Sequence, residues 1–141
     1  MLEKALLIAV QAHANQTDKA GMPYILHPLR VMMKMESVPE IIVAILHDVV
    51  EDSDWTIEQL KAEGFAEDIL DALDLLTKRK SEAYDEFIQW AKRTDLSRKV
   101  KLADLEDNMD TSRLRSITEE DMKRLEKYKR AWKELNGIFS L

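Results

Sequence analysis

The chain contains 141 residues, no cysteine and a formal net charge of −6. A chain of this length can bury one sizeable core but not two ordinary ones, so we expect a single domain over residues 1–141. The lack of cysteine excludes disulfides and thiolate zinc sites, and the negative charge argues against a broad surface for polymeric nucleic acid.

Apolar residues recur at helical spacing along most of the chain, and no segment alternates convincingly as a strand does. The first such segment, residues 2–14, carries Glu3 and Lys4 in its first turn. It is too short to span a bilayer, so we expect no signal peptide and no membrane helix. Pro28 suits the first turn of a second helix. We predict further helices at residues 38–52, 56–63, 66–77, 83–91, 96–109 and 118–135. The predicted architecture is a compact all-α bundle. We expect the protein to be cytoplasmic.

The stretch AILHDVVED, residues 44–52, places four polar side chains at the end of an apolar run. We expect a buried helix here, in which His47 and Glu51 share one face and Asp48 and Asp52 share the neighbouring one. Buried carboxylates without a partner cost many kcal/mol, so this cluster needs a compensating charge. A metal ion is the simplest one, and the alternative is a His-Asp salt bridge at the surface.

Two other segments supply residues that can complete a metal site. His27 lies where a loop meets a helix, and Asp104 follows the apolar residues of VKLADLEDN, with Asn108 one turn further on the same face. Alone, His27 is better interpreted as a structural histidine and Asp104 as part of a helix salt bridge. Together with His47 and Asp48 they form a mixed nitrogen and oxygen site that suits Mn²⁺, Fe²⁺ or Zn²⁺.

The order His27, His47-Asp48, Asp104 resembles that of the HD-domain metal-dependent phosphohydrolases. The segments AHANQTDKAGMPYILHPLRV, ILHDVVED and KLADLEDN resemble, more specifically, the hydrolase domain of the RelA/SpoT type. The resemblance covers roughly Gln11 to Asn108 in the order of the family. It implies a compact HD-domain helical bundle with the same four metal ligands.

The resemblance also implies an activity. Members of the family use one Mn²⁺-like ion to remove the 3′-pyrophosphate from (p)ppGpp, so we expect an enzyme that acts on a small-molecule nucleotide. Glu51 and Asp52 correspond to the acidic pair beside the attacking water, and Glu51 is the first choice for the proton transfer. Asn108 corresponds to a residue on the substrate side.

The chain departs from the family pattern in the loop before His27. Aligned on Gln16 and Gly21, it carries Asp18 where the family usually has an arginine that stacks on guanine, which leaves only Lys19 as a cation. This departure keeps two alternatives open. One is an HD phosphohydrolase that acts on another nucleotide, and the other is a nucleotide-binding module without turnover.

Further substrate contacts are predicted after the helix at 66–77. Lys78 and Arg79 can neutralise a pyrophosphate, and Tyr84 can hydrogen-bond it or pack on a base. The alternative for the basic run is a solvated helix terminus, favoured by the helix dipole. His13 is interpreted either as a site residue or as a histidine of the core.

Overall fold

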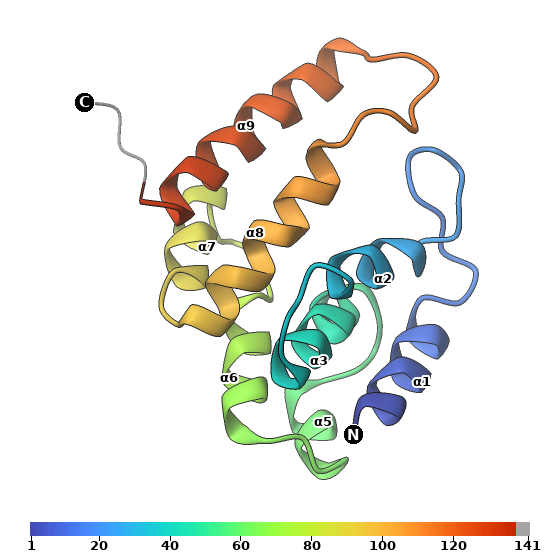
Figure 1. Ribbon diagram of the computed structural model, residues 1–141, viewed down its shortest axis with the longest axis vertical. Helices are drawn as coiled ribbons and strands as arrows, with labels where there is room; N and C mark the ends of the chain where they lie inside the picture. The colour runs from blue at the N-terminus through green and yellow to red at the C-terminus, as the bar shows by residue number, and fades with distance from the viewer. Residues whose placement is uncertain (138–141) are drawn as a thin grey trace.

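The computed structural model describes residues 1–137, which form nine α-helices and no β-sheet (Figure 1). The helices are α1 (Leu2–Ala12), α2 (Leu26–Met32), α3 (Val38–Leu46), α4 (Val49–Asp52), α5 (Ile57–Ala62), α6 (Glu67–Leu75), α7 (Tyr84–Ala91), α8 (Asp95–Met109) and α9 (Glu119–Leu135). An isolated bridge between Thr17 and Pro23 closes the loop between α1 and α2. The all-α prediction is therefore confirmed.

The central helix of the bundle is α3, which packs against α1, α2, α6 and α8 (Figure 1). Its residues Ile42 to Leu46 are all buried, as expected for a helix that has neighbours on several sides. A capping box starts this helix: the Ser37 side chain accepts a hydrogen bond from the backbone N–H of Glu40, whose carboxylate accepts one from the Ser37 N–H. The start of α3 is thus set by residues next to it in the sequence. The helix ends at Leu46, directly before His47.

Helix α8 packs between α3 and α9 and carries an unusual set of buried residues. Val100 and Leu105 belong to the core, but Lys101, Asp104 and Asp107 of the same helix are also buried. Buried charged side chains are rare unless they are paired. Each of these three is paired: Lys101 with Asp104, and Asp107 with His27 and Arg30.

The prediction of one continuous helix over residues 38–52 is wrong. Helix α3 ends at Leu46 and the one-turn helix α4 begins at Val49, so that His47 and Asp48 form a turn between them. The other predicted helices are present, with ends that differ by a few residues.

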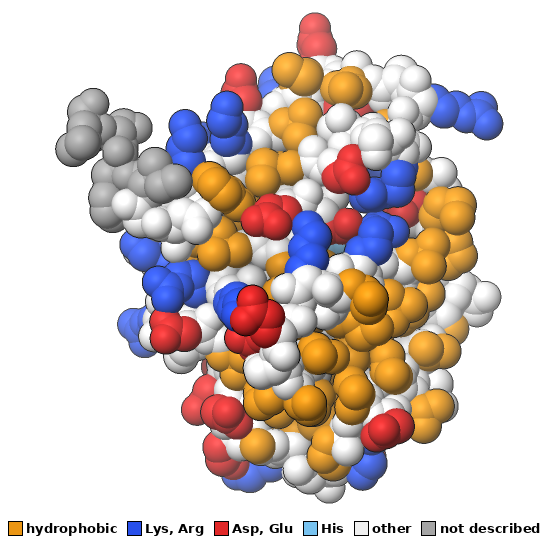
Figure 2. Space-filling model, in the orientation of Figure 1, with side chains coloured by type: hydrophobic (Ala, Val, Ile, Leu, Met, Phe, Trp, Pro, Cys, Tyr) orange, Lys and Arg blue, Asp and Glu red, His pale blue; other side chains and the backbone are white. Residues whose placement is uncertain are grey.

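Part of the surface is apolar. Leu7 and Val10 of α1, Met33 after α2 and Val38 of α3 remain exposed. Figure 2 shows hydrophobic side chains gathered on the side of the molecule where these three helices lie. Among residues 1–137, none of the helices combines the length and apolar character needed to cross a membrane.

Candidate metal centre and its cavity

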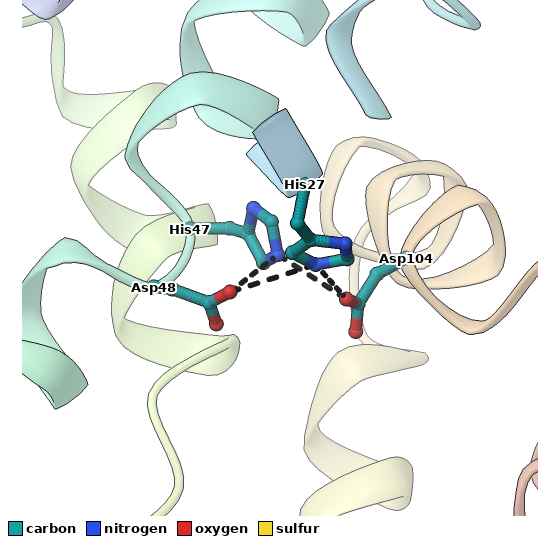
Figure 3. A group of neighbouring side chains, drawn as sticks. All are labelled: His27, His47, Asp48 and Asp104. Carbon is teal, nitrogen blue, oxygen red and sulfur yellow. Dashed lines mark hydrogen bonds and ion pairs between the residues drawn. The ribbon is translucent and has the colours of Figure 1, made fainter. Parts of the chain in front are cut away.

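Four side chains from separate parts of the chain meet at one point (Figure 3). His27 comes from the first turn of α2, His47 and Asp48 from the turn between α3 and α4, and Asp104 from the middle of α8. Each offers one nitrogen or oxygen atom, and these four atoms all lie within 4.8 Å of one another. The residues that the sequence predicted as metal ligands are thus brought together.

The break between α3 and α4 allows two consecutive residues to contribute to this cluster. In an uninterrupted helix, neighbouring side chains point about 100° apart and do not face each other. Here Asp48 has φ −104° and ψ −2°, outside ordinary helical values, and its Oδ2 lies 3.1 Å from Nε2 of His47. The prediction that His47 and Glu51 share one face of a continuous helix, and Asp48 and Asp52 the next, therefore does not hold.

Both imidazoles are held so that Nε2 points into the cluster. Nδ1 of His47 donates to the backbone oxygen of Ala44 at 2.6 Å. Ala44 lies in the last turn of α3. Nδ1 of His27 lies 2.6 Å from Oδ2 of Asp107. Metal-binding histidines are usually oriented in this way, by a carbonyl or carboxylate behind the ring. The outer nitrogens are thus occupied, and the inner ones face the carboxylates: Nε2 of His27 lies 2.8 Å and Nε2 of His47 lies 3.3 Å from Oδ1 of Asp104.

The carboxylates of Asp48 and Asp104 also accept hydrogen bonds from side chains outside this group of four. Lys101 donates to Oδ2 of Asp104 at 2.8 Å, and Asn108 donates to Oδ1 at 3.3 Å. The hydroxyl of Tyr24 donates to Oδ2 of Asp48 at 2.5 Å. Lys101 binds the oxygen of Asp104 that faces away from the histidines, whereas Asn108 and Tyr24 donate to the carboxylate oxygens nearest the imidazoles. The donor set of two imidazole nitrogens and two carboxylate oxygens fits a divalent transition metal.

The electrostatics of the cluster depend on shared protons. Burial lowers the pKa of His27, but hydrogen bonds to Asp104 and Asp107 outweigh it and raise this pKa to about 9. The pKa of His47 is also raised, against its burial, by Asp48 and Asp104. The pKa of Asp104 is lowered despite burial, first by the Lys101 ammonium and then by the two histidines. A bound cation would replace the protons on the imidazoles, since a metal needs neutral histidine ligands.

A cavity of about 370 Å³ opens beside His27. The loop between α1 and α2 and the loop between α8 and α9 lie on the same side of the molecule (Figure 1), and both line this cavity. Its wall includes Tyr24, Asn108 and Tyr128, together with both acidic and basic side chains: Asp18, Lys19, Arg30, Asp107, Asp110, Arg113, Asp121 and Arg124. The volume lies in the range of small-ligand sites.

No family model matches the chain, but individual relatives do. A guanosine-3′,5′-bis(diphosphate) 3′-pyrophosphohydrolase of Aquifex aeolicus is 32% identical over 148 aligned positions, which cover 99% of this chain and 20% of that protein. The bifunctional (p)ppGpp synthase/hydrolase SpoT of Escherichia coli is 37% identical over 95 positions, or 58% of this chain and 13% of that protein. The chain belongs to the SpoT/RelA-type hydrolase-domain family. It spans about a fifth or less of these relatives.

A solved structure shares the fold. It is described as a metazoan ortholog of SpoT that hydrolyzes ppGpp and plays a role in starvation responses, and it superposes with a TM-score of 0.79 at 24% identity. The superposition covers 99% of this chain and 87% of that one. The helical bundle expected from the RelA/SpoT resemblance is therefore confirmed.

The acidic pair Glu51 and Asp52 lies in the one-turn helix α4, and neither residue is among those that line the cavity. Glu51 and Asp52 are exposed, so the prediction that they are buried with His47 and Asp48 is wrong. Glu51 accepts a hydrogen bond from the backbone N–H of Lys78 at 2.8 Å. Partial desolvation, followed by the charges of Asp48 and Glu51, raises the pKa of Asp52 to about 6. The pKa of Glu51 is raised too, mainly by desolvation.

The predicted substrate contacts fall into two groups. Asn108 and Lys19 line the cavity, whereas Lys78, Arg79 and Tyr84 are not among its lining residues. The Arg79 guanidinium lies near Asp74 and over the ring of Trp90, at 5.3 Å from its centre.

Tyr84 begins α7 and lies on the Lys101 side of the metal ligands. Its hydroxyl is buried and finds no hydrogen-bond partner in the part of the chain that the structure describes. Burial raises its pKa to about 12, and the charges of Lys101 and Asp104 also act on it. Tyr84 is thus buried within the electrostatic influence of Lys101 and Asp104 but outside the cavity.

The departure at Asp18 has a local structural explanation. Its Oδ1 accepts hydrogen bonds from the backbone N–H groups of Ala20 and Met22, both at 2.9 Å. Gly21 in this turn has φ +82°, a value that glycine adopts without strain. The carboxylate therefore closes the loop at the mouth of the cavity.

Sequence reasoning missed the residues that support the ligands. Asp107 holds His27 and also accepts two hydrogen bonds from Arg30, at 2.7 and 3.1 Å. A signal was present in the spacing: Asp107 follows Asp104 by three residues, and Arg30 follows His27 by three, so each pair shares a helix face. Tyr24 lies in the loop before α2, where no periodicity points to a partner.

Proposed function

We propose that the chain is a metal-dependent pyrophosphohydrolase that removes the 3′-pyrophosphate of ppGpp or a closely related nucleotide. The observation that carries this proposal is the cluster of His27, His47, Asp48 and Asp104, which lies beside a cavity of ligand size. The printed names of the relatives from Aquifex aeolicus and Escherichia coli support the substrate.

The proposed metal is Mn²⁺. Two imidazoles and two carboxylates suit Mn²⁺, Fe²⁺ or Zn²⁺ better than Mg²⁺, because magnesium prefers oxygen ligands alone. When bound, the ion would lower the pKa of a water molecule and neutralise charge on the phosphate group. His27 and His47 would supply the nitrogens through Nε2, and Asp48 and Asp104 the oxygens.

The proposed reaction consumes one water. Its oxygen forms a bond to the phosphorus attached to the ribose 3′ oxygen, and the bond between that phosphorus and the 3′ oxygen breaks. The 3′ oxygen takes up a proton, so the products of ppGpp are GDP and pyrophosphate. A carboxylate must accept the proton of the water, and the most effective base has a pKa near the working pH.

We assign the role of general base, which accepts the proton of the water, to Asp52. Its pKa of about 6 leaves it ionised, yet basic, near neutral pH. Glu51, the first choice from the sequence, has its carboxylate tied to the Lys78 N–H and would position the pair. Both residues keep the catalytic role that the family resemblance implies.

We place the nucleotide in the cavity, with its 3′-pyrophosphate toward His27 and Asn108. Arg30, Arg113 and Arg124 are each paired with an aspartate, whereas Lys19 has no salt bridge among the described residues. Lys19 would therefore meet a phosphate at the far end of the nucleotide. A substrate of this kind fits a cytoplasmic enzyme.

Asp18 supports a second candidate, an HD phosphohydrolase for another nucleotide. Because its carboxylate closes the loop, this position offers neither a cation nor a stacking plane to guanine. Selectivity for guanine would then have to come from other residues of the cavity.

The two candidates are separated by a substrate panel. Purified protein with Mn²⁺ is incubated with ppGpp, its adenine analogue, GTP and nucleoside monophosphates, and the products are identified by chromatography. Pyrophosphate release from ppGpp that is lost in His47→Ala supports the proposal. Turnover of ordinary nucleotides without pyrophosphate release from ppGpp would favour the second candidate, and no turnover of any of them would remove both.

A further inference from the structure

We infer that His13 is a positioning residue that holds the one-turn helix α4, and with it Glu51 and Asp52, in the orientation needed for turnover. This inference rests on the proposed role of that acidic pair. His13 lies just after α1, is 2% exposed, and is not among the metal ligands or the residues that line the cavity.

Hydrogen bonds define how the His13 ring is used. The side-chain amide nitrogen of Gln16 donates to two backbone oxygens, that of Ala12 at 3.1 Å and that of Asp52 at 3.0 Å. The amide oxygen of Gln16 therefore faces His13, and Nδ1 of the histidine must donate to it, at 2.9 Å. His13 thereby selects the orientation in which Gln16 can reach Asp52.

Helix α4 depends on this external support. It has only four residues, Val49–Asp52, and one turn of helix is not stable alone in water. Its defining hydrogen bond runs from the Asp52 N–H to the Asp48 oxygen, at 2.9 Å. The Asp52 oxygen, left free at the C-terminal end, is the group that Gln16 binds.

His13 also contacts the support at the other end of α4. Its ring packs against Tyr24 with the ring centres 5.0 Å apart, and the Tyr24 hydroxyl holds Asp48. Asp48 is the residue directly before α4. One side chain thus touches two of the groups that hold this short helix, Gln16 at its end and Tyr24 at its start.

The second ring nitrogen of His13, Nε2, lowers the stability of the fold, which indicates that a histidine is present here for another reason. Nε2 is buried and has no hydrogen-bond partner among residues 1–137. An unpaired buried polar atom is unfavourable, and a phenylalanine would fill the same space without it. Buried groups that cost stability are concentrated at functional sites.

Two variants and a rescue test the inference. His13→Phe keeps the packing against Tyr24 but removes the donor to Gln16, and Gln16→Met removes the other half of the connection. His13→Asn places an amide N–H where Nδ1–H was and should restore the bond. Gln11→Ala, at an exposed residue on the same helix, is the matched control.

The first readout needs no turnover. We expect amide hydrogen exchange of Asp52 to become faster in His13→Phe and Gln16→Met, because this amide makes the hydrogen bond that defines α4, and to stay at the wild-type rate in His13→Asn and the control. A ¹⁵N spectrum of the wild type should show His13 protonated at Nδ1. Unchanged exchange in both disruptive variants, or a His13 without a proton at Nδ1, would overturn the inference whatever the substrate proves to be.

The second readout is steady-state hydrolysis of ppGpp at saturating Mn²⁺. We expect kcat to fall roughly tenfold to a hundredfold in His13→Phe, with KM and Mn²⁺ affinity nearly unchanged, because misplacement of a reacting group costs about this much. The double variant with Gln16→Met should be no slower than the single ones. A wild-type kcat in His13→Phe, or failure of His13→Asn to restore kcat, would overturn the positioning role. Absence of ppGpp hydrolysis by the wild type would instead contradict the proposed function and leave the exchange test decisive.

Discussion

Asp107 supports His27, one of the proposed metal ligands, and its replacement by asparagine tests that role. The wild-type carboxylate accepts from Nδ1 of His27 at 2.6 Å and from Arg30 at 2.7 and 3.1 Å, and it is 5% exposed. Asparagine has the same shape but only one acceptor oxygen, so its amide N–H₂ must face one of the donors. Either His27 or Arg30 loses its partner.

The size of the effect follows from these contacts. Loss of an outer-shell partner typically weakens metal binding about 10- to 100-fold, or roughly 1.4 to 2.7 kcal/mol. Breaking a buried ion pair costs about 3–5 kcal/mol when the remaining charge stays buried. The Arg30 side chain is 31% exposed and can turn to water, so we expect a loss of free energy of unfolding nearer to about 2 kcal/mol.

Calorimetric titration with Mn²⁺ measures the first quantity, and urea unfolding of the EDTA-treated protein measures the second. Asp110→Asn is the matched control, because Asp110 is exposed, pairs with Arg113 and has no contact with His27. We expect the control to bind Mn²⁺ as the wild type does. Mn²⁺ affinity within about threefold of the wild type in Asp107→Asn would refute the orienting role, because outer-shell partners are worth more than that.

Three further predictions concern the ligands and their protons. Asp48→Ala should abolish tight Mn²⁺ binding in a calorimetric titration, and undiminished binding would show that the ligand set is misassigned. Asp52→Asn should keep Mn²⁺ and the fold but lose about a hundredfold to ten-thousandfold in kcat, together with the rise of kcat near pH 6, and a loss below about threefold would exclude Asp52 as the base. Because the pKa of His27 is raised from 6.5 to about 9, its protonated form stabilises the metal-free fold fully below pH 6.5, and this contribution should disappear between pH 6.5 and 9. Urea unfolding in EDTA across that range should show decreasing stability, and added Mn²⁺ should oppose the trend.

The sequence determined the helical class and pointed to the four side chains that meet in one cluster. Helical periodicity, few glycines and prolines, and capping patterns such as Thr56 with Gln59 act over a few residues, so they can be recognised without a structure. His27, His47, Asp48 and Asp104 could be predicted because each is a polar residue in or beside an apolar segment, where a charge needs a partner.

Tertiary structure decided how those residues are held. The turn at His47 and Asp48 interrupts a sequence that reads as one helix, because contacts of Asp48 with Tyr24 and with the histidines outweigh local helical propensity. The support of His27 by Asp107 and of Asp52 by Gln16 joins residues 80 and 36 positions apart. Such pairs leave no periodic pattern in the sequence, since they form only when α2 packs against α8 and α1 packs against α4.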